Sequence, residues 1–269
     1  MTDQLSATAP IDPRFRRRLI EVRRHEGRRR LRLLAGAIAC AAVLGTVWVA
    51  SRSPLLDVDH VRLTGVAHTQ PLRIIQTAGS LPGRPMVDLD EAAAAQRIER
   101  LPWVADARVR RRWPNTVSIE VRERAPAASV PAAGGGWALV DDRGRVLEPV
   151  ANAPADRPAL EGVPPVGAPG TLVPASARGP LAVARALTPA LRLRVGAVVR
   201  APDGELRLRL RADGVVRLGD TGGLEPKLVA AEAVLGDLDT HGVDTHGVDT
   251  HGVAVLDVRT PDTPVLTRR

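Results

Sequence analysis

The sequence predicts an α+β protein with a single N-terminal transmembrane helix, a small βααββ domain and a mainly antiparallel β domain with helices. Three observations predict this fold class. Residues 33–51 form a run of 19 residues without a charge. Residues 54–124 carry, in this order, the patterns of one strand, two helices and two strands. Residues 125–269 hold several runs in which apolar and polar residues alternate, which is typical of antiparallel strands with one solvated face.

The positive charge of the chain lies almost entirely before the uncharged run. The formal net charge is +8, and residues 1–32 contain ten arginines against four acidic residues. Residues 53–269 contain 27 basic and 26 acidic residues. Because nucleic-acid-binding domains need a basic surface, this near-neutral part argues against a nucleic-acid partner. Cys40 is the only cysteine, so neither an intrachain disulfide nor a thiolate zinc site is expected.

The uncharged run is long enough to cross a membrane. As a helix, residues 33–51 would be roughly 28 Å long, close to the hydrocarbon thickness of a bilayer. Trp48 lies near its far end, where indole rings favour the interface. A cleaved signal peptide is the alternative, but the run is long for one, and Trp48 would occupy a position that needs a small residue if cleavage followed Ala50. We therefore expect a retained span in the cytoplasmic membrane. The arginines place the tail, residues 1–32, in the cytoplasm and the rest of the chain outside it.

The first domain begins with an alternating strand at 60–63. A helix is expected next, with Thr69 as its cap and Gly79 as its end. The spacing of Asp88 and Glu91 predicts a capping box before a second, alanine-rich helix. The core residues expected from the two helices are Leu72, Ile75, Ala78, Ile98 and Leu101.

Two strands, 105–112 and 117–124, follow around a turn at 113–115. The residues of inward parity are small or apolar: Ala105, Ala107, Val109, Val117, Ile119 and Val121. The residues of outward parity are polar: Asp106, Arg108, Arg110, Arg112, Ser118, Glu120, Arg122 and Arg124. We interpret the arginines as a solvated sheet face with partial charge pairing, and a contact surface for an acidic partner is the alternative.

The second domain is expected to contain two hairpins and two helices. Prolines and a glycine triplet predict a linker at 124–136, and residues 151–180 predict irregular structure. In the second hairpin Leu206, Leu208 and Leu210 face a core, while Arg207, Arg209 and Arg211 face solvent. The expected elements are a hairpin at 137–147, a helix at 181–191 interrupted at Pro189, a hairpin at 205–220, a helix at 226–238, a strand at 253–259 and a short edge segment at 264–267.

The pentapeptide DTHGV occurs three times in tandem, from Asp239 to Val253. Its histidines and aspartates are ligand types for divalent metals, so a metal site is one interpretation. Nothing in the sequence constrains the repeat into a cage, however. Repeat expansion that lengthens a surface loop explains it, because the cost of loop closure grows slowly with length. We therefore expect no metal or other cofactor.

The order of these features resembles the FtsQ/DivIB family of bacterial cell-division proteins. The resemblance is carried by LDVDHVRLTG (56–65), RLPWVADARVRRRWPNTVSIEVRERAPAA (100–128), RLGD (217–220) and VAVLDVRTPDTPV (253–265). It implies a POTRA domain at 54–124 and an FtsQ-type β domain at 125–269 with a short C-terminal tail. The chain departs from the family pattern at the DTHGV repeat, where relatives have a single connection between helix and strand.

The resemblance also implies a non-enzymatic scaffold of the division septum. Its expected partners are FtsB/DivIC-like and FtsL-like proteins, through which it would help to recruit and regulate the septal peptidoglycan synthase. An exposed strand edge accepts a partner strand through main-chain hydrogen bonds. In the family the C-terminal sheet edge receives the FtsB-like partner. The expected contact residues are therefore Val255, Asp257, Arg259, Val265 and Leu266.

Two other functions are compatible with parts of the sequence. A membrane-anchored cell-wall enzyme would need a nucleophile with its base or a paired acid and base, and no such motif is recognisable, so no catalytic residue is assigned. A polypeptide-handling protein of a secretion system would also carry POTRA domains. Those proteins usually contain several copies, whereas the sequence shows one.

Overall fold

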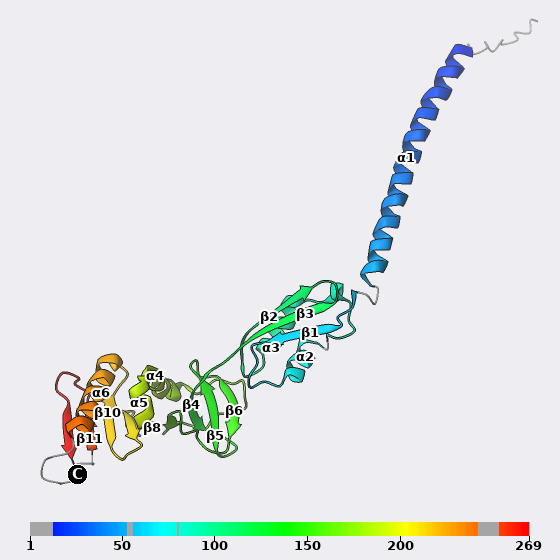
Figure 1. Cartoon of the computed structure of the whole chain (residues 1–269). Coiled ribbons are helices and arrows are strands. Elements are labelled where there is room, and N and C mark those ends of the chain that lie inside the picture. Colours follow the sequence, from blue (N-terminus) through cyan, green and yellow to red (C-terminus); the bar gives the residue numbers. More distant parts are fainter. Residues whose placement is uncertain (1–12, 53–55, 80, 242–252, 269) are drawn as a thin grey trace, which may run out of the picture. The chain divides into compact units, whose positions relative to one another are not determined.

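The computed structural model describes residues 13–52, 56–79, 81–241 and 253–268 (Figure 1). Its contacts divide the chain into two compact units. The first unit comprises Met1–His60, Pro82–Leu89 and Arg111–Thr116, and the second comprises Val61–Leu81, Asp90–Arg110 and Val117–Arg269. The fold is α+β, as predicted.

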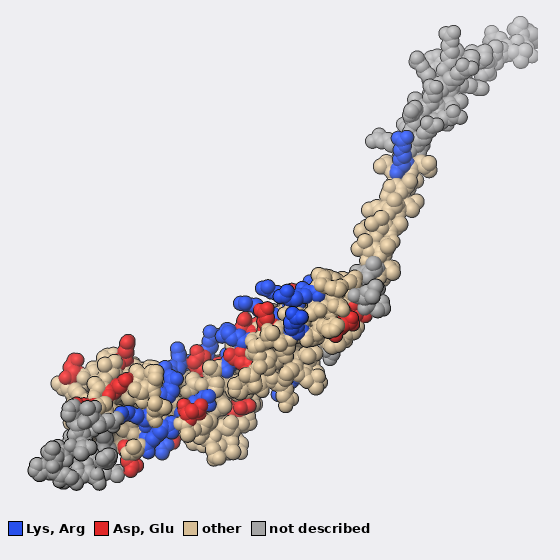
Figure 2. All heavy atoms as spheres, viewed as in Figure 1, with Lys and Arg blue, Asp and Glu red and all other residues tan. Residues whose placement is uncertain are grey.

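The first described element is one long helix, α1, at Pro13–Ser51. Its segment Arg30–Val49 is long and apolar enough to cross a membrane, and none of that segment is buried against other residues. Figure 2 shows basic side chains at the N-terminal end of this segment and none along its apolar length. The segment begins three residues before the predicted span, and its exposed leucine, isoleucine and valine side chains are suited to contact with lipid.

The elements of the small domain follow the predicted βααββ order. They are β1 (His60–Thr64), α2 (Pro71–Ala78), the short 3₁₀ helix η2 (Met86–Asp88), α3 (Glu91–Glu99), β2 (Val104–Arg112) and β3 (Thr116–Glu123). The three strands form one sheet in the order β1-β3-β2. Ile74, Ile98, Val117 and Ile119 have no exposed surface, so apolar residues of both helices and of the central strand form the core.

Both predicted N-caps of this domain are wrong, whereas Gly79 ends α2 as predicted. The N-cap of α2 is Gln70, which makes no side-chain cap bond, and the N–H of Thr69 donates to Glu123 Oε1 at 2.8 Å. The cap of α3 is Asp90, whose carboxylate accepts from the Ala93 N–H at 2.9 Å, so the predicted cap Asp88 lies two residues too early. Local spacing does not reveal Glu123 as the partner of Thr69, because the two residues are 54 positions apart.

Three predicted side-chain positions in the small domain also differ. Leu72 is 65% exposed, and Ile74 takes its expected place in the core, because the buried face of α2 is rotated from the predicted one. Ser118 is buried rather than solvated, since it lies on the central strand of the sheet. The side chain of Arg124 is 14% exposed and forms an ion pair instead of facing solvent. The remaining parities of β2 and β3 are confirmed.

The larger domain is built on a nine-stranded mixed sheet in the order β12-β11-β10-β9-β8-β7-β4-β5-β6. Five of its strand pairs are antiparallel, and the pairs β10–β11, β7–β8 and β4–β7 are parallel. The strands are β4 (Pro126–Pro131), β5 (Trp137–Asp141), β6 (Val146–Val150), β7 (Ala159–Glu161), β8 (Val195–Arg200), β9 (Leu206–Leu210), β10 (Val215–Gly219), β11 (Val253–Asp257) and β12 (Val265–Arg268).

The predicted linker at 124–136 is wrong, because six of its residues form strand β4. Its two prolines, Pro126 and Pro131, stand at the ends of the strand, where a missing N–H is tolerated. Between them Ala128, Ser129 and Val130 are fully buried. No predicted element corresponds to β8 or to the three-residue β7. Both hairpins are confirmed, as β5–β6 and β9–β10.

Three helices pack on the large sheet and share its core. They are α4 (Arg178–Ala186), α5 (Pro189–Arg194) and α6 (Leu224–His241). The expected interruption at Pro189 is confirmed, since that proline begins α5 and the side chain of Thr188 caps it by accepting from the Leu191 N–H. Leu228, Ala231 and Leu235 of α6 lie in the same buried cluster as Leu208, Leu218 and Leu256 of the sheet. Figure 1 shows α6 beside β10 and β11, the position of a crossover between two parallel strands.

Candidate partner-binding edge of the large sheet

Strand β12 forms one edge of the nine-stranded sheet. Among the described strands it pairs with β11 alone, in antiparallel register, with Leu256 opposite Leu266 and Asp257 opposite Val265. An edge strand presents a row of main-chain N–H and C=O groups that no neighbouring strand satisfies. The predicted edge segment at 264–267 is therefore confirmed as a strand, four residues long and one residue further along the chain.

The two predicted contact residues on β12 face opposite sides of the sheet. Val265 is 62% exposed, whereas Leu266 is partly buried and packs against the main core. Leu266 therefore fixes the strand to the domain, and Val265 remains available for contact. An apolar β-branched side chain that is mostly exposed on an edge is the residue type that a partner strand buries favourably.

The other three predicted contact residues lie one strand further in. Val255 and Asp257 belong to β11, which is paired on both sides, by β10 and by β12. Arg259 follows the strand, and its guanidinium binds Asp257 with an Nη2–Oδ2 distance of 2.6 Å. The structure thus brings all five residues into two adjacent strands and the turn that leaves β11.

A network of charged side chains covers the outer face beside this edge. Glu205 accepts from Arg207, with an Nη2–Oε2 distance of 2.6 Å, and from Arg217, with an Nη2–Oε1 distance of 2.9 Å. Arg217 also approaches Asp257 at 3.8 Å. The strand registers place Arg207, Arg217, Asp257 and Val265 in one row across β9, β10, β11 and β12. The exposed Val265 is thus the last residue of this row, and the other three residues are charged.

The pKa values of the carboxylates in this network are lowered. Burial raises the pKa of Glu205, but the hydrogen bonds from Arg207 and Arg217 outweigh this effect and lower it. The hydrogen bond from Arg259 lowers the pKa of Asp257. Both groups are therefore ionised at neutral pH and hold the arginines in place. Arg207 was predicted to face solvent, and the network was not predicted, although the alternation of Glu205 with Arg207 puts both on one face.

The single lysine of the chain supports the same end of the sheet. Lys227 is only 6% exposed, and its Nζ lies 2.9 Å from Asp220 Oδ1 and 3.2 Å from the Asp220 carbonyl oxygen. This contact joins the start of α6 to the end of β10. The contact gives a physical reason for pairing RLGD, which contains Asp220, with a helix start that contains Lys227.

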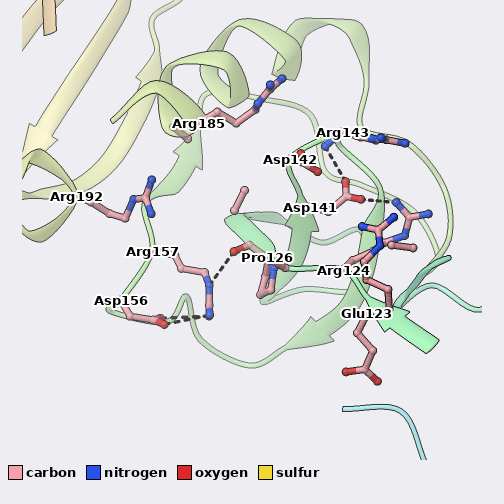
Figure 3. A pocket seen from close by; sticks show the side chains of 15 residues that line it. Glu123, Arg124, Pro126, Asp141, Asp142, Arg143, Asp156, Arg157, Arg185 and Arg192 are labelled. Carbon is pink, nitrogen blue, oxygen red and sulfur yellow. Dashed lines mark hydrogen bonds and ion pairs between the residues drawn. The ribbon is translucent and has the colours of Figure 1, made fainter. Parts of the chain in front are cut away.

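A polar cavity of about 710 Å³ lies elsewhere in the second unit. Figure 3 shows Arg157 and Arg192 on one side of it and Arg124 and Arg143 on the other. Arg124 Nη1 lies 2.7 Å from Asp141 Oδ2, and that carboxylate also accepts from the backbone N–H groups of residues 143 and 145. No serine, threonine, cysteine or histidine is among the described residues that line the cavity.

Two family models match the chain. The FtsQ-type POTRA domain matches residues 56–124, and the C-terminal domain of the cell division protein FtsQ/DivIB matches residues 128–259. Together these matches take in most of the chain. The chain belongs to the FtsQ/DivIB family.

Curated relatives of this FtsQ/DivIB chain carry the same family name. The cell division protein FtsQ of Anaeromyxobacter sp. (strain K) is 37% identical over 133 residues, which are 49% of this chain and 44% of the relative. FtsQ of Rhodothermus marinus is 34% identical over 184 residues, 67% of this chain and 66% of the relative. FtsQ of Corynebacterium glutamicum is 31% identical over 131 residues, 48% of this chain and 52% of the relative. The matches thus span about half to two thirds of these relatives, whose names describe a division protein and no reaction.

One solved structure of the family is also similar. It is the major extracytoplasmic domain of the cell division protein DivIB from Geobacillus stearothermophilus, with 19% sequence identity and a TM-score of 0.33. The similarity covers 45% of this chain and 98% of that one.

The DTHGV repeat of this FtsQ/DivIB chain lies mostly outside the described residues. Helix α6 ends at His241 and β11 begins at Val253, so His246, His251 and their neighbouring aspartates at 244 and 249 are not among the residues that the structure places. Within the described part of the chain, no group of three or more histidine, cysteine, aspartate or glutamate residues could hold a metal ion.

Proposed function

We propose that this protein is a non-enzymatic, single-pass scaffold of the bacterial division septum. Its FtsQ/DivIB family and its one apolar helix of spanning length support a membrane-anchored division protein. Its partners in this proposal are FtsB/DivIC-like and FtsL-like proteins. Through them it helps to recruit and regulate the septal peptidoglycan synthase, which it does not contact directly.

The proposed topology rests on charge. Ten arginines precede the span and Arg52 alone follows it closely, so the positive-inside rule keeps the N-terminus in the cytoplasm. In the same proposal residues 1–32 are a cytoplasmic tail, 33–51 the anchor, 54–124 the POTRA domain and 125–269 the β domain.

The free edge at β12 is the observation that carries the proposed partner contact. An extended partner segment adds a tenth strand there through main-chain hydrogen bonds, and Val265 supplies an apolar side-chain contact. Leu266 and the Asp257–Arg259 ion pair hold the strands in register for it. Val255 lies two residues from Asp257 and faces the same side of β11, so it extends the contact surface.

A photo-crosslinking amino acid at position 265, introduced into the full chain in dividing cells, tests this function. The expected product is a covalent adduct with a single-span division protein, identified after purification from membranes. The matched control carries the same amino acid at Leu193, which is 79% exposed on α5. An adduct at both positions, or at neither, would contradict the proposed site.

A further inference from the structure

A second surface lies at the end of the small domain that is nearest to α1 in the chain. Three segments, 56–60, 82–89 and 111–116, belong to the same compact unit as that helix. The Val58 N–H donates to the Arg84 carbonyl at 2.9 Å, and the Asp59 N–H donates to the Asn115 carbonyl at 2.9 Å. Arg111 Nη1 donates to the Met86 carbonyl at 3.3 Å. These bonds join the three segments into one end of the domain.

This end of the domain is held within short reach of the membrane. The spanning segment ends at Val49, and Asp57, which bridges to Pro85, follows only eight residues later. Eight residues extend over at most about 28 Å. Arg52 shortens the reach further, because its Nη2 lies 3.4 Å from Asp88 Oδ1 while its guanidinium stands 5.1 Å from the ring of Trp48. Trp48 is near the end of the span, at the depth where indole rings are favoured.

The same end exposes two large apolar side chains. Trp113, in the turn between β2 and β3, is 55% exposed, and Val87 in η2 is 44% exposed. Tryptophan has an apolar ring and one N–H donor, so it is stable where hydrocarbon meets headgroups and water. Exposing these two side chains to water does not stabilise the protein, whereas an adjacent bilayer buries them in an apolar environment.

The charges of these segments nearly cancel. Within the three segments Arg84, Arg111 and Arg112 stand against Asp57, Asp59 and Asp88, and Arg52 adds one positive charge next to them in the chain. A surface with this balance has little attraction for anionic lipid, which draws clusters of several basic residues. The indole and the valine therefore decide the interaction, and the identity of the headgroup matters little.

We propose that the β2–β3 turn, with Trp113 as its anchor, inserts into the headgroup region of the bilayer that α1 crosses, with Val87 of η2 as a second apolar contact. The inference rests on the membrane topology of the proposed function and on no part of the partner assignment. Its consequence is that segments 56–60, 82–89 and 111–116 are held to the bilayer at two points, by the span and by the turn.

Quenching of tryptophan fluorescence by brominated lipid tests the inference. The full chain is reconstituted into vesicles whose acyl chains carry bromine either near the headgroup or near the bilayer centre. The wild type is compared with Trp113→Phe and Trp48→Phe, so that the loss of quenching in each variant reports the depth of one ring. Trp103 and Trp137 are common to all three proteins. The quenching lost with Trp113→Phe is expected to be at least about twofold larger for the shallow bromines than for the deep ones.

The outcomes separate this inference from the proposed topology. If Trp48→Phe loses quenching and Trp113→Phe loses none, α1 spans the bilayer and the inference is overturned. If neither variant loses quenching, the topology and the inference both fail. Vesicles with and without anionic lipid should give the same Trp113 quenching within about twofold. Quenching confined to anionic vesicles would overturn the inference, because it would assign the contact to the arginines.

Discussion

Glu123 shows how one side chain can organise a loop that no local pattern predicts. Its carboxylate accepts from the backbone N–H groups of Ala67, His68 and Thr69 at 3.1, 2.9 and 2.8 Å. The ring of His68 stacks on Trp103 with centroids 4.4 Å apart. Burial raises the pKa of Glu123, but the hydrogen bonds from Thr69 and His68 prevail and lower it to about 2.

The pKa of Glu123 predicts a pH-dependent stability. The pKa is about 2 in the folded protein against the ordinary value of 4.5, so the carboxylate stabilises the fold above pH 4.5 and this contribution is lost as the pH falls from 4.5 to 2. The contribution is about 3 kcal/mol in free energy of unfolding. Glu123→Gln should lose most of it at pH 7 and show a smaller further loss on acidification. Unfolding monitored by tryptophan emission between pH 7 and pH 3 measures this.

The control for this prediction is Glu120→Gln, on the exposed face of the same strand. It should unfold like the wild type at every pH. Equal acid sensitivity in the Glu123 variant and the wild type would show that the carboxylate does not stabilise the loop.

Residue contacts of this kind explain most errors of the sequence-based predictions. Thr69 and Asp88 were predicted as caps from spacing alone, yet Glu123 is 54 residues from Thr69 in the chain. Arg124 was predicted to face solvent, and Asp141, 17 residues later, takes it into an ion pair. The alternation of residues along a strand indicates which face of the sheet a side chain is on. It does not indicate which residue of another helix or strand that side chain binds.

At the scale of elements, alternating strands were predicted well and short or proline-bounded ones were not. The hairpins β2–β3 and β9–β10 each contain runs of period two joined by a turn sequence, and β5–β6 was predicted from its turn residues at 142–144. β4 is bounded by prolines, and β7 has only three residues, so neither carries a periodic signal. The sequence alone does not distinguish such a strand from a linker.

The DTHGV repeat gives a prediction about the connection between α6 and β11. Deleting one unit, Asp244–Val248, should leave the melting temperature within about 2 °C and division unaffected, because the entropy of closing a connection depends little on its length. Deleting two units, Asp244–Val253, places Val243 at the start of β11. The end of α6, residues 239–241, then has to serve as the connection, so a larger loss of up to about 5 °C is expected.

The same variants test the metal interpretation of the repeat. Zinc bound to the full chain at one ion per molecule, and abolished by either deletion, would show that its histidines are ligands. Equal zinc content in the wild type and both variants agrees with a loop that has no metal.

At the scale of the whole molecule, the arginine asymmetry predicts the orientation in the membrane. A reporter enzyme that is active only outside the cytoplasm should work when fused after Arg124 and fail when fused before Arg28. The reason is the positive-inside bias of the ten arginines that precede the span. Activity of the early fusion with silence of the late one would place the bulk of the protein in the cytoplasm and contradict the proposed scaffold.

The sequence carried more information about the candidate site than about its surroundings. The edge segment could be predicted because the turn at 260–262 separates two short extended runs at the end of the domain. That β12 is outermost follows from the strand order, which no single-sequence pattern specifies. The Glu205–Arg217–Asp257 network depends on that same order, since its members come from three chain segments up to 52 residues apart.

The central claim is that a partner adds a strand to β12, and one binding measurement tests it most directly. The full chain in detergent or nanodiscs is titrated with the FtsB-like partner as wild type, Val265→Pro, Val265→Lys and the triple variant Arg108→Ser, Arg110→Ser, Arg112→Ser.

Proline removes a main-chain donor and fixes φ, so Val265→Pro should weaken binding at least about tenfold while the protein stays folded. Val265→Lys keeps the main-chain N–H at position 265, the residue opposite Asp257 in the strand register, and should weaken binding less than Val265→Pro does. The triple variant should bind like the wild type. Unchanged binding by the proline variant together with lost binding by the arginine variant would contradict the account and move the site to the β2–β3 hairpin.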